Sequence, residues 1–379
     1  MSDGVIDEAS AAAPAKQRDA LFDVAKGIGI LLVLGHHSFS NSARLYTTPF
    51  TPAWWVLSMA NRVLSFSVPV FLLISAILSA RSLIKNPAVG LFYKRRFPGL
   101  LWPYLMWTLI YWVGRMIQDP AARKSATTRL LGHTIHGPAM LLHFRERLNE
   151  ILWGKAFFHM YFLVVLIGLL LLLPLAVKYV RWRKPGFWEA VLTAFVVQAL
   201  IMIVQHKTAW VKYPGSNVLW YMGSLLPGAW IGVNWDLFRE KFGGLTRPLL
   251  AIILVMGTSF LGQEVLQMLG TEADNYLYNG SLTVYASCLS VAMLILAMKL
   301  TPIGRWRKLL EPLGKNSLQI YLMHPGIMQV LERPRVASLL NETYLGPLLS
   351  PALMLGITFG LIWLMRVAKV ERFVFGRTF

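Results

Sequence analysis

The chain has 379 residues, of which 56% are hydrophobic and only 15% are charged, and its mean hydropathy is +0.53. Soluble domains carry about 25% charged residues, so this composition excludes an ordinary soluble fold. The formal net charge of +19 does not indicate nucleic-acid binding, because membrane proteins gather Lys and Arg in cytoplasmic loops and no nucleic-acid motif is present. The single cysteine, Cys288, allows neither an intrachain disulfide nor a CxxC metal site.

Apolar runs of about 20 residues, long enough to cross a bilayer, recur along the chain. The weak alternation that is typical of barrel strands is not the pattern here. We therefore expect an all-α polytopic membrane protein with about ten transmembrane helices. The expected spans are 20–38, 61–80, 99–118, 157–180, 187–205, 217–236, 247–268, 279–300, 314–331 and 345–367.

The distribution of basic residues predicts how the chain is oriented. The loops after the second, fourth and eighth expected spans are rich in Lys and Arg, whereas the loop after the seventh has Glu272 and Asp274 and no basic residue. By the positive-inside rule, the even-numbered loops and both termini face the cytoplasm. The acidic N-terminal segment has no apolar h-region, so it does not have the features of a cleavable signal peptide.

The expected organisation is one membrane domain, 20–368, between short cytoplasmic tails at 1–19 and 369–379. The longest loop, 119–156, contains several arginines although it is predicted to be extracytoplasmic. Within it, HTIHGPAMLLHFRERLNEILWG is typical of an amphipathic or re-entrant segment. We expect this segment to cover a site on the far side of the membrane.

The first span contains ionisable groups within DVAKGIGILLVLGHHSFS, residues 23–40. An α-helix turns about 100° and rises about 1.5 Å per residue, so His37 lies about 20° from Lys26 around the axis and about 16 Å along it. Asp23 falls within about 60° of both, whereas His36 lies about 80° from Lys26. Asp23, Lys26 and His37 therefore share one stripe of the helix.

Ionisable residues in a span usually face the protein interior or a wet cavity. Lys26 can bind an anion, with Asp23 one turn away as its counter-ion. His37 can act as a general base because imidazole titrates near neutral pH. The spacing alone fits a structural role equally well, in which Lys26 snorkels to the interface and the histidines cap the end of the span.

DVAKGIGILLVLGHH resembles the opening motif of the acyltransferase 3 family of membrane O-acyltransferases, in which ten residues separate a basic residue from a histidine. Lys26 and His37 match this spacing. An alignment that allows a one-residue gap selects His36 instead, but deleting one residue within a helix rotates everything after it by about 100°. We therefore favour His37 and keep His36 as the alternative.

FSVPVFLLISAILSA, 66–80, is similar to the family's second-span pattern, with Ala76 where glycine is usual. This pattern is typical of helix packing. YKRRFPGLLWPY, 93–104, resembles the basic stretch before the family's third span, although Gly99 replaces one arginine of the usual pair. The alternative for this stretch is ordinary positive-inside charge. Cationic side chains suit the phosphates of coenzyme A, and the resemblance assigns this role to Lys94, Arg95 and Arg96.

Two more segments resemble family motifs. FFHMYFLVVLIGLLLLLPL, 157–175, is similar to a His-aromatic-Phe-Leu opening, and LGKNSLQIYLMHPGIM, 313–328, to a late Gly-x-x-Ser-Leu-x-Ile-Tyr-Leu-x-His motif. The first segment would equally suit an interfacial aromatic belt, and the second would suit interhelical hydrogen bonding. The resemblance implies that substrate is bound by His36, His159, Tyr161, Ser317, Tyr321 and His324.

The resemblance implies a multi-pass enzyme of a bacterial inner membrane that transfers an acyl group from cytoplasmic acyl-CoA, acetyl-CoA above all, to a sugar hydroxyl. The absence of an appended SGNH domain favours direct transfer to an envelope or secreted polysaccharide, such as an exopolysaccharide, or to its lipid-linked oligosaccharide precursor. Succinyl transfer and a small-metabolite acceptor fit the same scheme. A transporter or flippase for a lipid-linked glycan has the same hydropathy and charged stripe, and an inactive scaffold also fits the sequence. No metal and no nucleic-acid partner is expected, and the oligomeric state is left open.

Overall fold

The computed structural model describes residues 19–120, 125–130, 133–138, 143–333, 336–337 and 346–376. Within these residues each of the ten expected spans coincides with a helix, and seven helical stretches are long and apolar enough to cross a membrane. The chain is therefore a polytopic membrane protein. The helices at the expected spans are α1 (Ala20–Tyr46), α3 (Ser67–Lys85), α5 (Pro98–Gln118), α9 (Tyr161–Arg183), α10 (Phe187–Thr208), α11 (Met222–Val233), α12 (Trp235–Met268), α13 (Asn275–Leu300), α15 (Ser317–Leu331) and α17 (Gly346–Val367).

Three of these ten helices, α5, α11 and α15, are not among the seven stretches that qualify as spans, and α11 has only 12 residues.

Shorter elements connect the ten helices. The connecting elements are α2 (Pro52–Val63), η1 (Leu64–Phe66), α4 (Val89–Arg96), α8 (Phe144–Trp153), η2 (Pro214–Ser216), η3 (Val218–Tyr221), α14 (Gly304–Lys315) and α18 (Glu371–Phe375).

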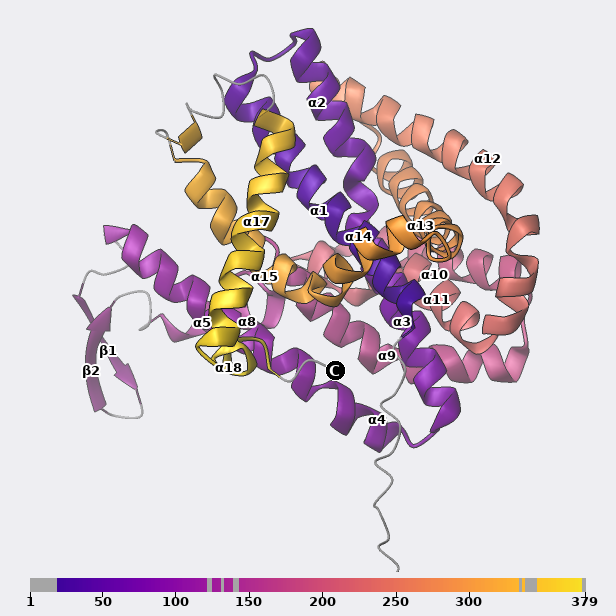
Figure 1. Cartoon of the computed structure of the whole chain (residues 1–379), viewed down its shortest axis with the longest axis horizontal. Coiled ribbons are helices and arrows are strands. Elements are labelled where there is room, and N and C mark those ends of the chain that lie inside the picture. The colour runs from indigo at the N-terminus through magenta and orange to yellow at the C-terminus, as the bar shows by residue number, and fades with distance from the viewer. Residues whose placement is uncertain are drawn as a thin grey trace, which may run out of the picture.

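One hairpin departs from the all-helical expectation. Strands β1 (Ser125–Leu130) and β2 (His133–Pro138) pair antiparallel, with Ser125 opposite Pro138. The hairpin lies at the edge of the molecule beyond the end of α5 (Figure 1). The segment predicted to be amphipathic is thus divided between β2 and α8, and residues 139–142 between them lie outside the described residues. Local pairing within the loop satisfies backbone groups that a helix would otherwise satisfy.

The expected tails are only partly described. Residues 1–18 and 377–379 lie outside the described part of the chain. Asp19 is the N-cap of α1, where its carboxylate accepts a hydrogen bond of 3.2 Å from the Leu21 amide. At the other end α18 packs against α5: the Trp102 indole donates to the Phe373 carbonyl at 2.6 Å, and Phe375 is buried.

Helix α1 occupies the centre of the bundle. It contacts α2, α3, α13, α14, α15 and α17, and Figure 1 shows α12 and α13 on one flank of it and α17 on the other. A Cβ atom on Gly27 would overlap the Leu310 carbonyl oxygen, and a Cβ atom on Gly314 would overlap the Asp23 carbonyl oxygen. Glycines on both helices therefore allow α1 and α14 to cross at backbone contact distance.

Small residues also bring α3 and α11 together. A Cβ atom on Gly228 would lie 2.6 Å from Cβ of Ala76, and one on Gly232 would lie 2.7 Å from Cβ of Ala80. Close helix approach in membranes depends on small residues at the crossing. Ala76, which stands where the related pattern has glycine, therefore faces a glycine on the partner helix.

Substitution of Gly314 by alanine should destabilise the fold strongly. The new methyl group meets the backbone of α1, which cannot rotate away as a side chain can, so we expect a loss at or above the about 1–3 kcal/mol typical of overpacking. The unfolding temperature of the purified protein measures the loss. Gly360→Ala, in α17 and with open space around its Cβ position, is the matched control and should be neutral or slightly stabilising. Equal unfolding temperatures for the two variants would contradict the close crossing.

Candidate functional site

Four histidines from three separate segments converge inside the bundle. His36 and His37 come from α1, His159 precedes α9, and His324 lies on α15. The ring centroids of His37 and His324 are 5.3 Å apart, and those of His159 and His324 are 5.7 Å apart. His159 and His324 are buried. The fold thus gathers imidazoles that are more than a hundred residues apart in the sequence.

A cavity of about 360 Å³ lies in front of this cluster, and we call it the histidine cavity. His36, His37 and His159 line it, whereas His324 packs behind them and is not among the lining residues. Most of the remaining lining is aromatic, hydroxyl or amide in character, including Tyr161, Gln198, Trp220, Tyr221, Asn279 and Tyr321. Such a lining can bind a hydroxyl-rich ligand.

The two neighbouring histidines of α1 have different surroundings. Nδ1 of His36 lies 2.9 Å from the Asn61 carbonyl oxygen, and the Asn61 amide donates to the His36 carbonyl at 2.7 Å. His36 is therefore tied to α2. The His37 ring instead contacts the rings of Phe158 and His324, with centroids 5.2 and 5.3 Å away. This arrangement places His37, rather than His36, against the other histidines.

Residues of α15 orient His159 and His324. The Tyr321 hydroxyl donates to the His159 carbonyl at 2.5 Å, and Nδ1 of His324 lies 2.7 Å from the Tyr321 carbonyl oxygen. Three buried ring nitrogens, Nδ1 and Nε2 of His159 and Nε2 of His324, have no hydrogen-bond partner among the described residues. Buried polar atoms normally find a partner, so these nitrogens can interact with a water or ligand that enters the site.

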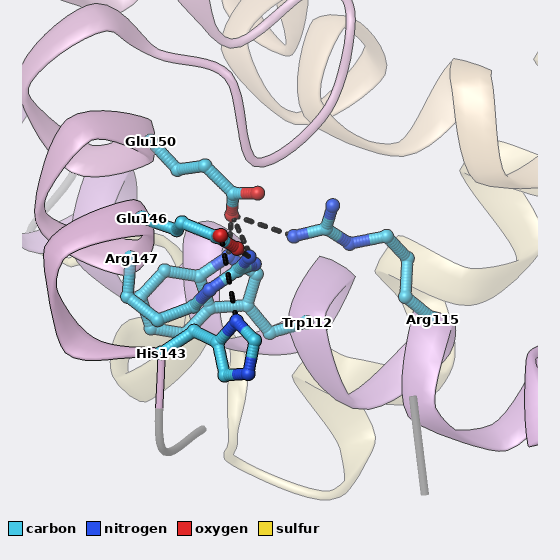
Figure 2. Close-up of polar contacts among 6 residues, drawn as sticks. All are labelled: Trp112, Arg115, His143, Glu146, Arg147 and Glu150. Atoms are coloured by element: carbon cyan, nitrogen blue, oxygen red, sulfur yellow. Dashed lines mark hydrogen bonds and ion pairs between the residues drawn. The ribbon is translucent and has the colours of Figure 1, made fainter. Parts of the chain in front are cut away.

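Helix α8 fixes the chain just before His159, and a salt-bridge network holds α8 against the end of α5 (Figure 2). The Glu150 carboxylate accepts hydrogen bonds from Trp112, Arg115 and Arg147 at 2.7, 2.6 and 2.7 Å. The chain then turns at Gly154, whose φ of +64° favours glycine and whose Cβ position would overlap the backbone of Tyr161. The network and the turn together position the segment that carries His159.

At the rim of this network, Glu146 pairs with His143 at 3.4 Å and with Arg147 at 3.3 Å, as Figure 2 also shows. The hydrogen bond with His143, assisted by Arg147, lowers the pKa of the Glu146 carboxyl. Because Glu146 is largely exposed, solvent screens these pairs and they contribute little to stability.

A second cavity, of about 250 Å³, lies at the end of α1 where the helix begins, and we call it the lysine cavity. Lys26 and Lys315 line it. The Lys26 ammonium lies 2.6 Å from the carboxylate of Asp23, which is 1% exposed. Tyr321 lines both this cavity and the histidine cavity. The two cavities are therefore neighbours with a tyrosine between them.

Lys315 also pairs with Glu311 at 2.6 Å. Hydrogen bonds from Lys315 and Arg307 lower the pKa of the Glu311 carboxyl, so it stays ionised at neutral pH. Half of the Lys315 side chain remains exposed, and its ammonium can contact a ligand in the lysine cavity.

A sequence model of the acyltransferase domain matches residues 19–367 of the chain. The chain belongs to the acyltransferase 3 family. Membership implies a membrane enzyme that transfers an acyl group from a donor to an acceptor. No curated protein and no solved structure matches the chain significantly.

The remaining predicted residues of this acyltransferase lie in several places. Lys94 and Arg95 are exposed on α4 and Arg96 is half-buried, and none of the three is among the residues that line the histidine or lysine cavity. Burial lowers the pKa of the Arg96 guanidinium, but a guanidinium stays charged in proteins. Gly99 lines the lysine cavity, three residues beyond Arg96.

Ser317 does not share a cavity with the histidines. It lines the lysine cavity together with Tyr321, whereas His324 of the same motif lines neither this cavity nor the histidine cavity. Asn61, Arg62 and Lys315 were not expected in the site. Lys315 lies within the LGKNS segment, so the motif there could have indicated that it belongs to the site. Asn61 and Arg62 belong to no sequence motif, and only tertiary packing brings them to the site.

Loss of the Glu150 carboxylate should release α8. Glu150→Ala removes three charge-assisted hydrogen bonds, each worth about 1.5–3 kcal/mol at most, and leaves two arginines without this partner. We expect faster hydrogen exchange in residues 144–158, measured by mass spectrometry. Glu146→Ala, on the same helix but exposed, should leave exchange there unchanged. Equal exchange in both variants would contradict the role of the Glu150 network.

Proposed function

We propose that this acyltransferase moves an acetyl group from acetyl-CoA at the cytoplasmic end of the bundle to a sugar hydroxyl on the opposite side of a bacterial inner membrane. The observation that carries the proposal is the pair of neighbouring cavities: Lys26 lines one, His37 lines the other, and Tyr321 lines both. A donor and an acceptor could each occupy one cavity and meet near Tyr321. Succinyl transfer would use the same arrangement.

The lysine cavity suits the donor. It lies where α15 and α5 begin, and the segments leading into these helices carry the basic residues of the even-numbered loops. The positive-inside rule favours a cytoplasmic location for these loops and for both termini. In this proposal Lys26 and Lys315 contact the phosphates of acyl-CoA, and Lys94, Arg95 and Arg96 attract the anion at the entrance. Asp23 balances and orients Lys26.

The histidine cavity suits the acceptor. His37 takes the proton from a sugar hydroxyl while the hydroxyl oxygen attacks the thioester carbonyl carbon. The carbon–sulfur bond then breaks, and the thiolate of coenzyme A leaves and takes up a proton. Transient acylation of His37 before transfer fits the same geometry. His36, His159, Tyr161 and Tyr321 would contact the sugar, and His324 would hold the His37 ring.

The proposed acceptor is an envelope or secreted polysaccharide or its lipid-linked oligosaccharide precursor. The aromatic, hydroxyl and amide groups of the histidine cavity can stack against a sugar ring and hydrogen-bond its hydroxyls. The enclosing bilayer would present a lipid-linked form of such an acceptor from the side.

Replacing His37 should abolish transfer. General-base catalysis is typically worth about 10²- to 10⁴-fold, so we expect His37→Ala to lower turnover by about that factor with normal expression. The measurement is the O-acetyl content of surface glycans in a host that lacks the gene and carries the variant. His36→Ala is the matched comparison and should retain more activity. Normal acetylation with His37→Ala would show that His37 is not the general base. If His36→Ala lost more activity than His37→Ala, the role of general base would pass to His36.

Coenzyme A should stabilise the purified protein against heat. A ligand that binds only the folded state adds about 2.7 kcal/mol at a concentration one hundred times its Kd. We expect a rise in unfolding temperature with coenzyme A, and a smaller rise for Lys26→Gln and Lys315→Gln. Lys308→Gln, exposed on α14 and outside the lysine cavity, is the control and should respond as the unchanged protein does. A transporter of lipid-linked glycans needs no thioester, so the absence of any shift at millimolar coenzyme A would favour transport.

A further inference from the structure

A third cavity, of about 400 Å³, lies at the opposite end of α1 from Lys26, and we call it the arginine cavity. Arg44 from α1 and Arg62 from α2 line it, together with Ser40, Thr47 and Asn61. None of its lining residues is Asp or Glu. Arg62 also lines the histidine cavity, so the arginine cavity and the histidine cavity are neighbours on either side of this side chain.

Arginines are unexpected at this end of the molecule. In the proposed orientation, the loop between α1 and α2 faces away from the cytoplasm, where membrane proteins place few Lys and Arg residues. The topology therefore does not account for Arg44 and Arg62, and their position around a cavity next to the site favours a role in binding.

A buried carboxylate, that of Glu264, pairs with Arg62. Nε of Arg62 lies 3.1 Å from Glu264, whose side chain is 2% exposed. The Tyr278 hydroxyl donates to the second carboxylate oxygen at 2.6 Å, so both oxygens of Glu264 are occupied. A guanidinium has five N–H donors, and the contact through Nε leaves the two terminal nitrogens of Arg62 available to a ligand.

Arg44 is held in a similar way. One terminal nitrogen lies 3.2 Å from Glu332, and the Asn41 amide donates to the other carboxylate oxygen of Glu332 at 2.6 Å. More than half of the Arg44 side chain is exposed. Two guanidinium groups thus line one cavity, and arginine binds carboxylate and phosphate groups in a planar, bidentate geometry.

We propose that the arginine cavity binds an oxyanion of the acceptor, a uronate carboxylate or a phosphate, while a hydroxyl of the same molecule lies beside His37. This inference rests on the proposed function and specifies the substrate class: the acceptor is an anionic glycan. The arginines would then select acceptors by charge and set which hydroxyl reaches the imidazole.

The test compares acceptors that differ only in charge. The purified protein, in liposomes of zwitterionic lipid, is given acetyl-CoA with a uronate-containing oligosaccharide, its carboxyl-reduced neutral form, or a phosphorylated oligosaccharide. We expect kcat/KM to be higher for an anionic acceptor than for the neutral form, and the better of the two anions identifies the oxyanion. Loss of the contact in Arg44→Gln should lower this preference about tenfold or more, as a charge-assisted hydrogen bond implies.

Matched variants separate binding from folding. Arg62→Gln leaves Glu264 buried without its cation and can unfold the protein, so it is combined with Glu264→Gln. Arg44→Gln carries less of this risk because Glu332 is partly exposed. Arg145→Gln, exposed on α8 and outside the cavities named here, is the control and should keep the preference. A thermal-shift titration with the uronate oligosaccharide alone should give a rise that the Arg44 and Arg62 variants lose.

The outcomes distinguish the two proposals. If no acceptor is acetylated and coenzyme A does not bind, the proposed function fails. If the enzyme acetylates the neutral and anionic acceptors equally, or if Arg44→Gln changes KM for both alike, the arginine cavity does not read acceptor charge and this inference is overturned. Stabilisation by liposomes of anionic lipid that is lost in the arginine variants, without any charge preference among acceptors, would assign the cavity to a lipid headgroup and would equally overturn it.

Discussion

The close crossing of α1 and α14 around the Asp23–Lys26 pair is the constraint on which the site depends. Burying a charge is costly unless a partner lies close by, and here the ammonium and carboxylate are 2.6 Å apart with Asp23 almost fully buried. Gly314 packs against the backbone at Asp23, so this part of the helix cannot rotate without a clash. With the rotation of α1 fixed at its beginning, the helical repeat turns His37 toward the interior rather than toward lipid.

The interior of the bundle is divided rather than continuous. Tyr321 contributes to both the lysine cavity and the histidine cavity, and its hydroxyl is committed to the His159 carbonyl. In the proposed function a charged coenzyme does not need to cross the membrane, because only its acyl group passes from one cavity to the other.

Helical periodicity predicted the shared stripe of Lys26 and His37, and the length of the apolar runs predicted the positions of the long helices, because both signals are local in the sequence. The gathering of His37, His159 and His324 could be anticipated only from resemblance, since no spacing relates three segments that meet through tertiary packing. Ser317 begins α15 and lines the lysine cavity but not the histidine cavity, whereas Tyr321, one turn further along the helix, lines both. The loop segment that is predicted to be amphipathic forms helix α8 only in its second half, whereas the hairpin and the Glu150 network depend on contacts that no local pattern predicts.

The unpaired imidazole nitrogens lower the stability of the folded protein. Nε2 of His324 and both nitrogens of His159 are buried without a partner among the described residues, and an unsatisfied buried polar atom costs about 1–3 kcal/mol. A bundle selected only for stability would fill these positions with apolar side chains. Their retention beside a polar cavity is understandable if a hydroxyl-rich ligand or water satisfies them on entry, because the cost is then recovered as binding free energy. The Arg62–Glu264 pair differs from these imidazoles, because both carboxylate oxygens of Glu264 already have partners within the protein.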